Sequence, residues 1–265
     1  MPRLFDHCLA RPEPVSLHDF LQTATAVGST DPVAQRARAL LADPERARQA
    51  RSVRTGGTGL ILDDAKQAVV IAAEAVHHRV ADADVLELYA QLREQPVLPA
   101  EEALFIEVQK LRTLGPLTSY GWLVVRRPTE QGHELQAWLS TEWGGKLLSG
   151  IASLWIDLHA DGRYVCEPDT PGPATRIAFA DAPDRPGLLP SVFDPLVTAV
   201  LPSTVATLLA SLAVVRTAEL PAIHLDQAQS ARYRRRTGCP LTPYRKIPAQ
   251  DPVLNALVPA VREES

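Results

Sequence analysis

The sequence predicts an α+β fold, because its hydrophobic period changes twice along the chain. Apolar residues recur at three- and four-residue spacings through the first part, which is typical of amphipathic helices. Aromatic and β-branched residues dominate from Ser119 to Val125, as they do in strands, and further strand-like stretches continue to Phe179. The helical spacing returns from Ser191 to Val215. We therefore expect a mainly helical region over 1–115. Over 116–265 we expect an antiparallel sheet, two helices packed against it and a basic C-terminal tail.

Length and composition place the chain among globular proteins. It has 265 residues, of which 46% are hydrophobic and 22% charged, with a formal net charge of -4. These values exclude collagen-like, mucin-like and wholly disordered classes. Cys8, Cys166 and Cys239 form an odd set without a close pair, and the N-terminal residues lack the apolar core of a signal peptide. We expect reduced thiols and a cytoplasmic protein that needs no cofactor and no metal.

Local start signals predict the N-terminal helices. Ser16, Asp31-Pro32 and Asp43-Pro44 can each begin one, because their side chains accept hydrogen bonds from the first turn. A longer helical pattern runs from Asp63 to His78, and Asp82 can begin a further helix that ends before Pro96.

Alternating hydrophobicity predicts the strands of the second region. The expected strands are Ser119–Val125, Glu134–Leu139, Ala152–Leu158, Arg163–Cys166 and Thr175–Phe179. Turn residues lie at 130–132 and 161–162, the latter being Asp-Gly, a strong hairpin signal. Because these connections are short, we expect antiparallel pairing, with Trp122, Trp138 and Trp155 in strands.

One uncharged stretch, Pro195 to Val215, is long enough to span a bilayer. It has no Trp or Tyr at either end, where a spanning helix usually carries an aromatic belt. We expect instead two buried helices, Ser191–Val200 and Ser203–Val215, separated at Pro202, and no membrane association.

Three short motifs invite a chemical interpretation, and each has a simpler one. The Gly-rich residues 55–59 lack the lysine of a phosphate-binding loop and are expected to form a turn. Adjacent His77 and His78 point about 100° apart on a helix, so we expect a solvated helix end rather than a metal site. His159 and Cys166 flank the Asp161 turn, where a base and a thiolate nucleophile are conceivable, but no further residue supports a triad.

The C-terminal segment is the most distinctive part of the chain, because no acidic residue occurs from Gln227 to Gln250. We expect its basic and aromatic residues to contact nucleic acid or an acidic partner: Arg234, Arg235, Arg236, Tyr244, Arg245 and Lys246. Arginines neutralise phosphates and tyrosines stack on unpaired bases. The alternative is that these arginines pair with carboxylates of the same chain, the outcome that we expect for Arg232. The acidic net charge also argues against a dedicated nucleic-acid binder.

This tract resembles a known kind of sequence. The pattern Arg232-x-Arg234-Arg235-Arg236-x-Gly238-x-Pro240-Leu241-x-x-Tyr244-x-x-Ile247 is similar to the C-terminal tract of uncharacterised proteins of tailed phages and prophages. The resemblance covers about 50 residues and brings no established activity and no catalytic residue. It implies a phage-derived gene in a bacterial host, with the tract forming a packed strand.

These observations predict a non-catalytic accessory protein, of phage or prophage origin, whose Arg-rich C-terminal segment contacts nucleic acid or an acidic protein partner. The alternative hypothesis is a metal-dependent nuclease or a nucleotide-acting hydrolase with an unrecognised site. The sequence contains no catalytic motif that favours this alternative.

Overall fold

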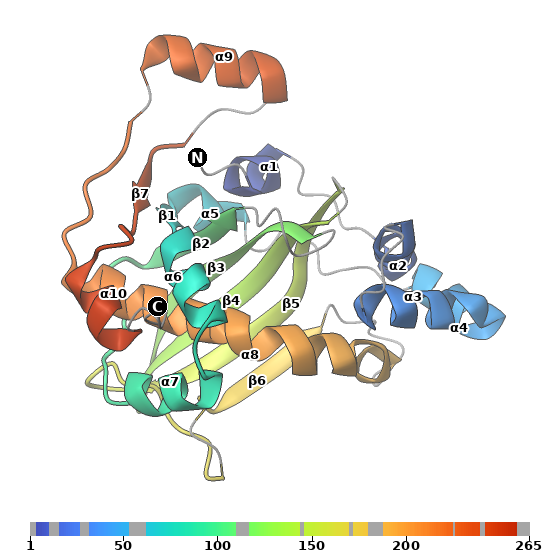
Figure 1. The fold of residues 1–265 in the computed structure, drawn as a ribbon, viewed down its shortest axis with the longest axis horizontal. Coiled ribbons are helices and arrows are strands. Elements are labelled where there is room, and N and C mark those ends of the chain that lie inside the picture. The colour runs from blue at the N-terminus through green and yellow to red at the C-terminus, as the bar shows by residue number, and fades with distance from the viewer. Residues whose placement is uncertain are drawn as a thin grey trace, which may run out of the picture.

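The computed structural model describes residues 4–10, 16–26, 32–52, 62–109, 117–143, 146–169, 172–179, 188–224, 226–238 and 242–258 (Figure 1). Its helices are α1 Leu4–Ala10, α2 Leu17–Ala26, α3 Pro32–Ala42, α4 Pro44–Ser52, α5 Leu62–Gln67, α6 Glu74–Ala81, α7 Val85–Leu92, α8 Leu188–Thr217, α9 Gln227–Thr237 and α10 Pro252–Leu257. Its strands are β1 Val69–Ala72, β2 Ala103–Gln109, β3 Leu117–Thr129, β4 Gly132–Trp143, β5 Lys146–His159, β6 Thr175–Phe179 and β7 Tyr244–Lys246.

The strands form one seven-stranded sheet in the order β6-β5-β4-β3-β2-β1-β7. Strands β2 to β6 pair antiparallel, whereas β1 pairs parallel with both β2 and β7. The predicted α+β class is therefore confirmed, but the sheet is mixed rather than antiparallel. The physical reason is the connection between β1 and β2, which contains α6 and α7 and so returns the chain in the same direction.

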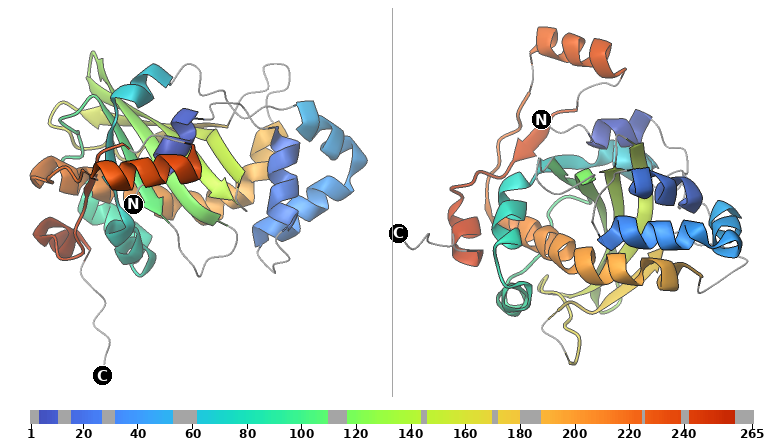
Figure 2. Two further views of the ribbon diagram at one scale, coloured as in Figure 1. Left: turned by 90° about the horizontal axis from the view of Figure 1, so that it is seen from above. Right: turned by 45° about the vertical axis from the view of Figure 1, so that its right-hand side comes forward.

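The two faces of the sheet bury two apolar clusters. On one face, α6, α7 and α8 cover alternate residues of the strands, and Trp122 of β3 packs there with Leu208 and Leu212 of α8. On the other face, Leu4 and Phe5 of α1 pack in a second cluster. It contains Phe105 of β2 and Leu123 and Val125 of β3. Figures 1 and 2 show α8 crossing the strands of β3 to β5, with α2, α3 and α4 gathered at one end. The sheet is thus the common layer to which both ends of the described chain attach.

Two strands lie within the region that the sequence predicts to be helical. Val69–Ala72, inside the predicted helix from Asp63 to His78, is strand β1, and Ala103–Gln109 is strand β2. Val69, Val70 and Ile71 are β-branched, and β1 has a hydrogen-bonded neighbour on each side. That pairing overrides the helical spacing, which Ala68 and Ala72 share with the neighbouring helices.

Helix α8 is continuous, so the predicted break at Pro202 is wrong. The Tyr89 hydroxyl donates a hydrogen bond of 2.6 Å to the Pro202 carbonyl, and Thr204 donates one of 3.0 Å to the Leu201 carbonyl. The buried face from Val205 to Val215 packs against the sheet, which compensates for the hydrogen bond that a proline cannot donate. Within the described residues, no helix combines the length and the apolar character needed to cross a membrane.

Most local predictions in the described residues are confirmed. Ser16 Oγ accepts a hydrogen bond of 3.1 Å from the Asp19 amide, and Asp43 Oδ1 one of 2.9 Å from the Glu45 amide, so both begin helices as expected. Helix α7 begins at Asp84 rather than at Asp82, because Asp84 Oδ1 accepts from the Leu86 amide at 2.8 Å. The predicted strands at 119–125, 134–139, 152–158 and 175–179 lie in β3 to β6, and three tryptophans, Trp122, Trp138 and Trp155, lie in strands. The Gly-rich residues 55–59 lie outside the described residues.

We expect Gly121→Ala to destabilise the sheet. A Cβ atom at Gly121 would lie 2.6 Å from Cε1 of Phe105, whose ring is buried and packs on Phe5 at a centroid separation of 4.9 Å. Overpacking of this kind costs about 1–3 kcal/mol, to be measured by urea unfolding. In a Phe105→Leu background the added methyl has room, so the same change should cost clearly less. An equal loss in both backgrounds would contradict a steric origin of the effect.

Candidate functional site

The basic segment forms a helix that projects from the edge of the molecule. Asp226 begins α9 by accepting a hydrogen bond of 2.7 Å from the Gln229 amide, and Gly238 ends it in the left-handed conformation at φ 74°. At the base of this excursion, the Ile223 amide donates to the Tyr244 carbonyl at 2.6 Å and the Tyr244 amide donates back at 3.3 Å. Figures 1 and 2 show α9 at the periphery, beside α1. The tract therefore contains the last residues of α9 and the short strand β7, Tyr244–Lys246, whereas the resemblance implied a packed strand.

The arginines of α9 occupy its solvent side. Arg232, Arg234 and Arg235 are exposed, whereas Tyr233 is only 3% exposed. Two residues further along a helix is a rotation of about 200°, so Arg235 lies opposite the buried tyrosine. No ion pair connects these three arginines to a carboxylate within the described part of the chain, which for Arg232 differs from the expected pairing. Arg236 lies on the same helix, and its side chain lies outside the described residues.

A buried carboxylate of α1 is hydrogen-bonded to the segment that follows α9. Asp6 Oδ1 accepts hydrogen bonds from the Thr242 amide at 3.1 Å and from the Thr242 hydroxyl at 2.7 Å. Asp6 is only 1% exposed, and burial raises its pKa to about 6, although the groups of Thr242 and the Tyr233 hydroxyl act in the opposite direction. No local sequence signal pointed to Asp6, Tyr233 or Thr242 as partners, because 236 residues separate the two hydrogen-bonded residues.

Strand β7 places the remaining predicted residues in the sheet. Tyr244 is half-buried and pairs with Val70 of β1, and Arg245 Nη1 donates a hydrogen bond of 2.7 Å to Oε1 of Glu101. Lys246 is exposed. The six predicted residues therefore belong to two elements: Arg234, Arg235 and Arg236 to α9, and the other three to β7 at the edge of the sheet.

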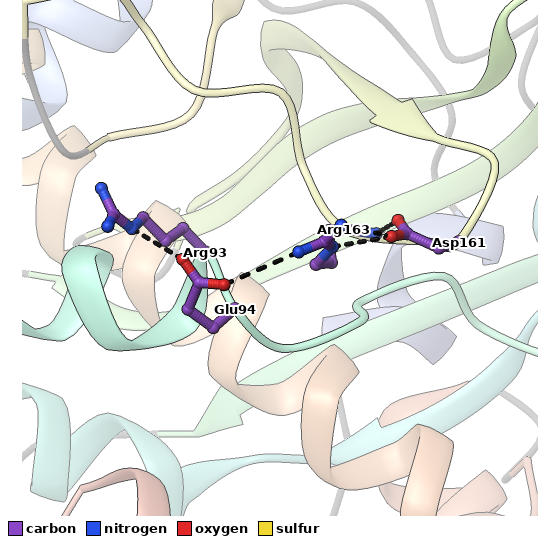
Figure 3. Close-up of polar contacts among 4 residues, drawn as sticks. All are labelled: Arg93, Glu94, Asp161 and Arg163. Carbon is purple, nitrogen blue, oxygen red and sulfur yellow. Dashed lines mark hydrogen bonds and ion pairs between the residues drawn. The ribbon is translucent and has the colours of Figure 1, made fainter.

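The hairpin at Asp161 carries a chain of surface ion pairs (Figure 3). Asp161 Oδ2 lies 2.7 Å from Nη2 of Arg163, Arg163 Nη1 lies 3.6 Å from Glu94, and Glu94 pairs at 3.0 Å with Nε of Arg93. The hydrogen bond from the Arg163 side chain lowers the pKa of Asp161. The Gly162 carbonyl also accepts from the Val97 amide at 2.7 Å. The Arg163–Glu94 pair and the Val97–Gly162 hydrogen bond thus connect the hairpin to the chain between α7 and β2.

His77 is buried, contrary to the prediction of a solvated helix end. It is 8% exposed, and its Nδ1 lies 2.7 Å from the hydroxyl of Tyr120, whereas His78 is exposed. Burial, with a smaller contribution from the charge of His78, lowers the pKa of His77 to about 4. The helix α6 starts at Glu74 and presents His77 to β3 and α8, so the ring is part of the core.

Among the residues that the structure describes, no group of three or more His, Cys, Asp or Glu side chains is arranged to hold a metal ion. Compared with known proteins, the chain matches no protein-family model, no curated protein and no solved structure. The exposed arginines of α9 are therefore the candidate site that the geometry itself defines.

We expect the buried His77 to make the protein less stable in acid. Its pKa is about 4 in the folded protein against 6.5 in the unfolded chain, so this part of the stability is present above pH 6.5 and is lost as the pH falls to 4. The loss amounts to about 2–3 kcal/mol. Urea unfolding between pH 7 and pH 4 should show a shallower pH dependence for His77→Gln. The exposed neighbour provides a control, since His78→Gln should keep most of the wild-type slope; equal slopes in all three proteins would contradict the prediction.

We expect Arg245 to stabilise the fold. Arg245→Met leaves Glu101 without its hydrogen-bonded cation and should lower the free energy of unfolding by about 1 kcal/mol. The exposed neighbour offers a matched control, and Lys246→Met should change stability by less than about 0.5 kcal/mol. Thermal and urea unfolding of both variants would measure these changes in stability. A larger loss for the lysine variant would show that Arg245 does not have the stabilising role assigned to it.

Proposed function

We propose that this protein is a non-catalytic accessory protein of phage or prophage derivation that binds the phosphate backbone of nucleic acid through α9. The observation that carries the proposal is the set of exposed arginines on a projecting helix, without ion-pair partners among the described residues. An arginine that has no internal carboxylate can neutralise a phosphate at little cost, because no existing ion pair has to break.

The charge distribution along the segment supports a polyanionic partner. The carboxylates that border α9 are Asp226 and Asp251, and neither the helix nor the following strand contains another. Asp226 is engaged with the Gln229 amide and Asp251 with the Val253 amide at 2.9 Å. The helix therefore presents one sign of charge although the whole chain has a net charge of -4, so a local contact and not overall attraction has to provide the affinity.

The positions of the tyrosines favour duplex nucleic acid over single strands. Tyr233 lies on the buried side of α9, and Tyr244 is half-buried in β7. Neither therefore offers a free ring face of the kind on which unpaired bases stack. Phosphate contacts do not need stacking and depend little on base sequence. We therefore propose a weak sequence preference and a strong dependence on salt.

The test is a charge reversal of the helix. The variant with Arg234→Glu, Arg235→Glu and Arg236→Glu should bind a fluorescent duplex more weakly at every sequence tested. Each lost phosphate contact should also flatten the slope of log affinity against log salt by roughly one unit. Fluorescence anisotropy at several salt concentrations, with duplex and single-stranded DNA and RNA, measures both quantities. Unchanged affinity and slope in the variant would overturn the proposal.

Helix α4 provides a matched control. It carries three exposed arginines, Arg46, Arg48 and Arg51, and two of them already pair with Asp43 at 3.5 Å and with Glu45 at 3.1 Å. Reversal of these charges should leave binding within about twofold, because the charge there is already balanced locally. If the protein binds an acidic polypeptide but not nucleic acid, the partner is an acidic protein and the nucleic-acid proposal is wrong. Shortening of the nucleic acid when Mg²⁺ is added would favour the hydrolase alternative.

A further inference from the structure

A single buried carboxylate connects the three segments that determine where α9 lies. Asp6 belongs to α1, it accepts two hydrogen bonds from Thr242 just after α9, and the hydroxyl of Tyr233 from α9 itself acts on it. Tyr233 is the buried residue of the Arg-rich stretch of α9, so this junction is where that stretch meets the body. The state of one side chain therefore affects the attachment of the whole basic helix.

The groups around this carboxylate are mostly uncharged. From β2, the buried Glu107 faces the same helix, but its oxygens accept from the amides of Leu4 and Phe5 at 2.9 and 3.3 Å. From β7, Tyr244 packs beside the apolar cluster of α1, and α1 itself carries His7 and Cys8. The causes of the pKa shift of Asp6 are burial and the hydrogen bonds of Thr242 and Tyr233, and they include no neighbouring charge.

Burial and solvation act in opposite directions at this position. With α9 docked, the carboxylate is shielded from water, which disfavours its charged form. When α9 leaves, the same carboxylate regains water and ionises as it would in an unfolded chain. The hydrogen bonds of Thr242 and Tyr233 favour the charged carboxylate, but burial outweighs them, so the docked arrangement is more stable with the proton bound.

We propose that Asp6 is a pH-sensitive latch for α9: the protonated carboxyl holds the basic helix against α1, and the loss of its proton to solvent loosens it. The folded protein with α9 docked binds this proton more tightly than the undocked form, so docking is favoured at low pH. That advantage is fully present below pH 3.8 and is lost as the pH rises through about 6. The latch itself concerns only the position of α9. Its consequence, control over a phosphate-binding surface, rests on the proposed function.

Hydrogen exchange of the α9 amides in the full chain tests the latch. A helix of this length is marginal when it is detached, so its amides exchange when α9 leaves the body. After correction for the chemical exchange rate, we expect the protection of α9 to fall by roughly 10-fold between pH 5 and pH 7.5 and to level off above about pH 6. Asp6→Asn, which carries no charge at any pH, should keep the acid level of protection throughout.

Three further variants test whether Asp6 is the group that titrates. His7→Gln should keep the step, because the proposal assigns it to the carboxyl group of Asp6. Tyr233→Phe and Thr242→Val each remove a hydroxyl that lowers the pKa of Asp6, so in both variants the fall in protection should level off at a higher pH than in the wild type. If Asp6→Asn does not fold, the direction of these two shifts decides between Asp6 and another titrating group. A wild-type step that is absent, that persists in Asp6→Asn or that disappears in His7→Gln overturns the proposal, whatever the result of the nucleic-acid binding assay.

Discussion

The pairing of β1 on both of its edges is the constraint on which the rest of the structure depends. β1 contributes only four residues, Val69–Ala72, yet it joins β2 on one side and β7 on the other. The backbone hydrogen bonds continue past the ends of the strands. The Ala73 amide donates to the backbone carbonyl of Glu107 at 2.8 Å, and the Ile247 amide donates to the carbonyl of Ala72 at 3.1 Å. Without β1, strand β7 would have no partner in the sheet, and the base of the α9 excursion would have no fixed position.

Buried polar groups continue this constraint outwards from the sheet. Glu107 of β2 is fully buried, and its carboxylate binds the amides of Leu4 and Phe5, which orients α1. Helix α1 in turn places Asp6 against Thr242. A buried carboxylate is costly unless donors surround it, so each of these groups is stable only while the next segment is in place. Each segment therefore positions the next one, from β1 through β2 and α1 to α9.

The same tract of basic sequence has two physical roles because its residues meet different surroundings. In β7, Arg245 reaches Glu101 in the loop just before β2, and the ion pair makes this residue part of the fold. In α9, the buried Tyr233 fixes one side of the helix, so Arg234 and Arg235 project to solvent. Between these two parts, Thr242 is hydrogen-bonded to Asp6, whose pKa is raised to about 6 by burial. The arginine that stabilises the sheet and the arginines that we propose to contact a partner thus lie within about 20 residues of each other in the chain.

The sequence by itself determined the features that depend on neighbouring residues. These include the helix starts at Ser16 and Asp43, the strands of β3 to β6, the Asp161 turn and the concentration of arginines after Gln227. Only the tertiary structure decided the features that depend on distant partners. Strand β1 forms within a helical pattern because β2 and β7 supply its hydrogen bonds, α8 passes through Pro202 because the sheet buries one of its faces, and Asp6 meets Thr242 across most of the chain. Periodicity and capping describe interactions over a few residues, whereas burial and strand pairing are set by contacts that no short segment contains.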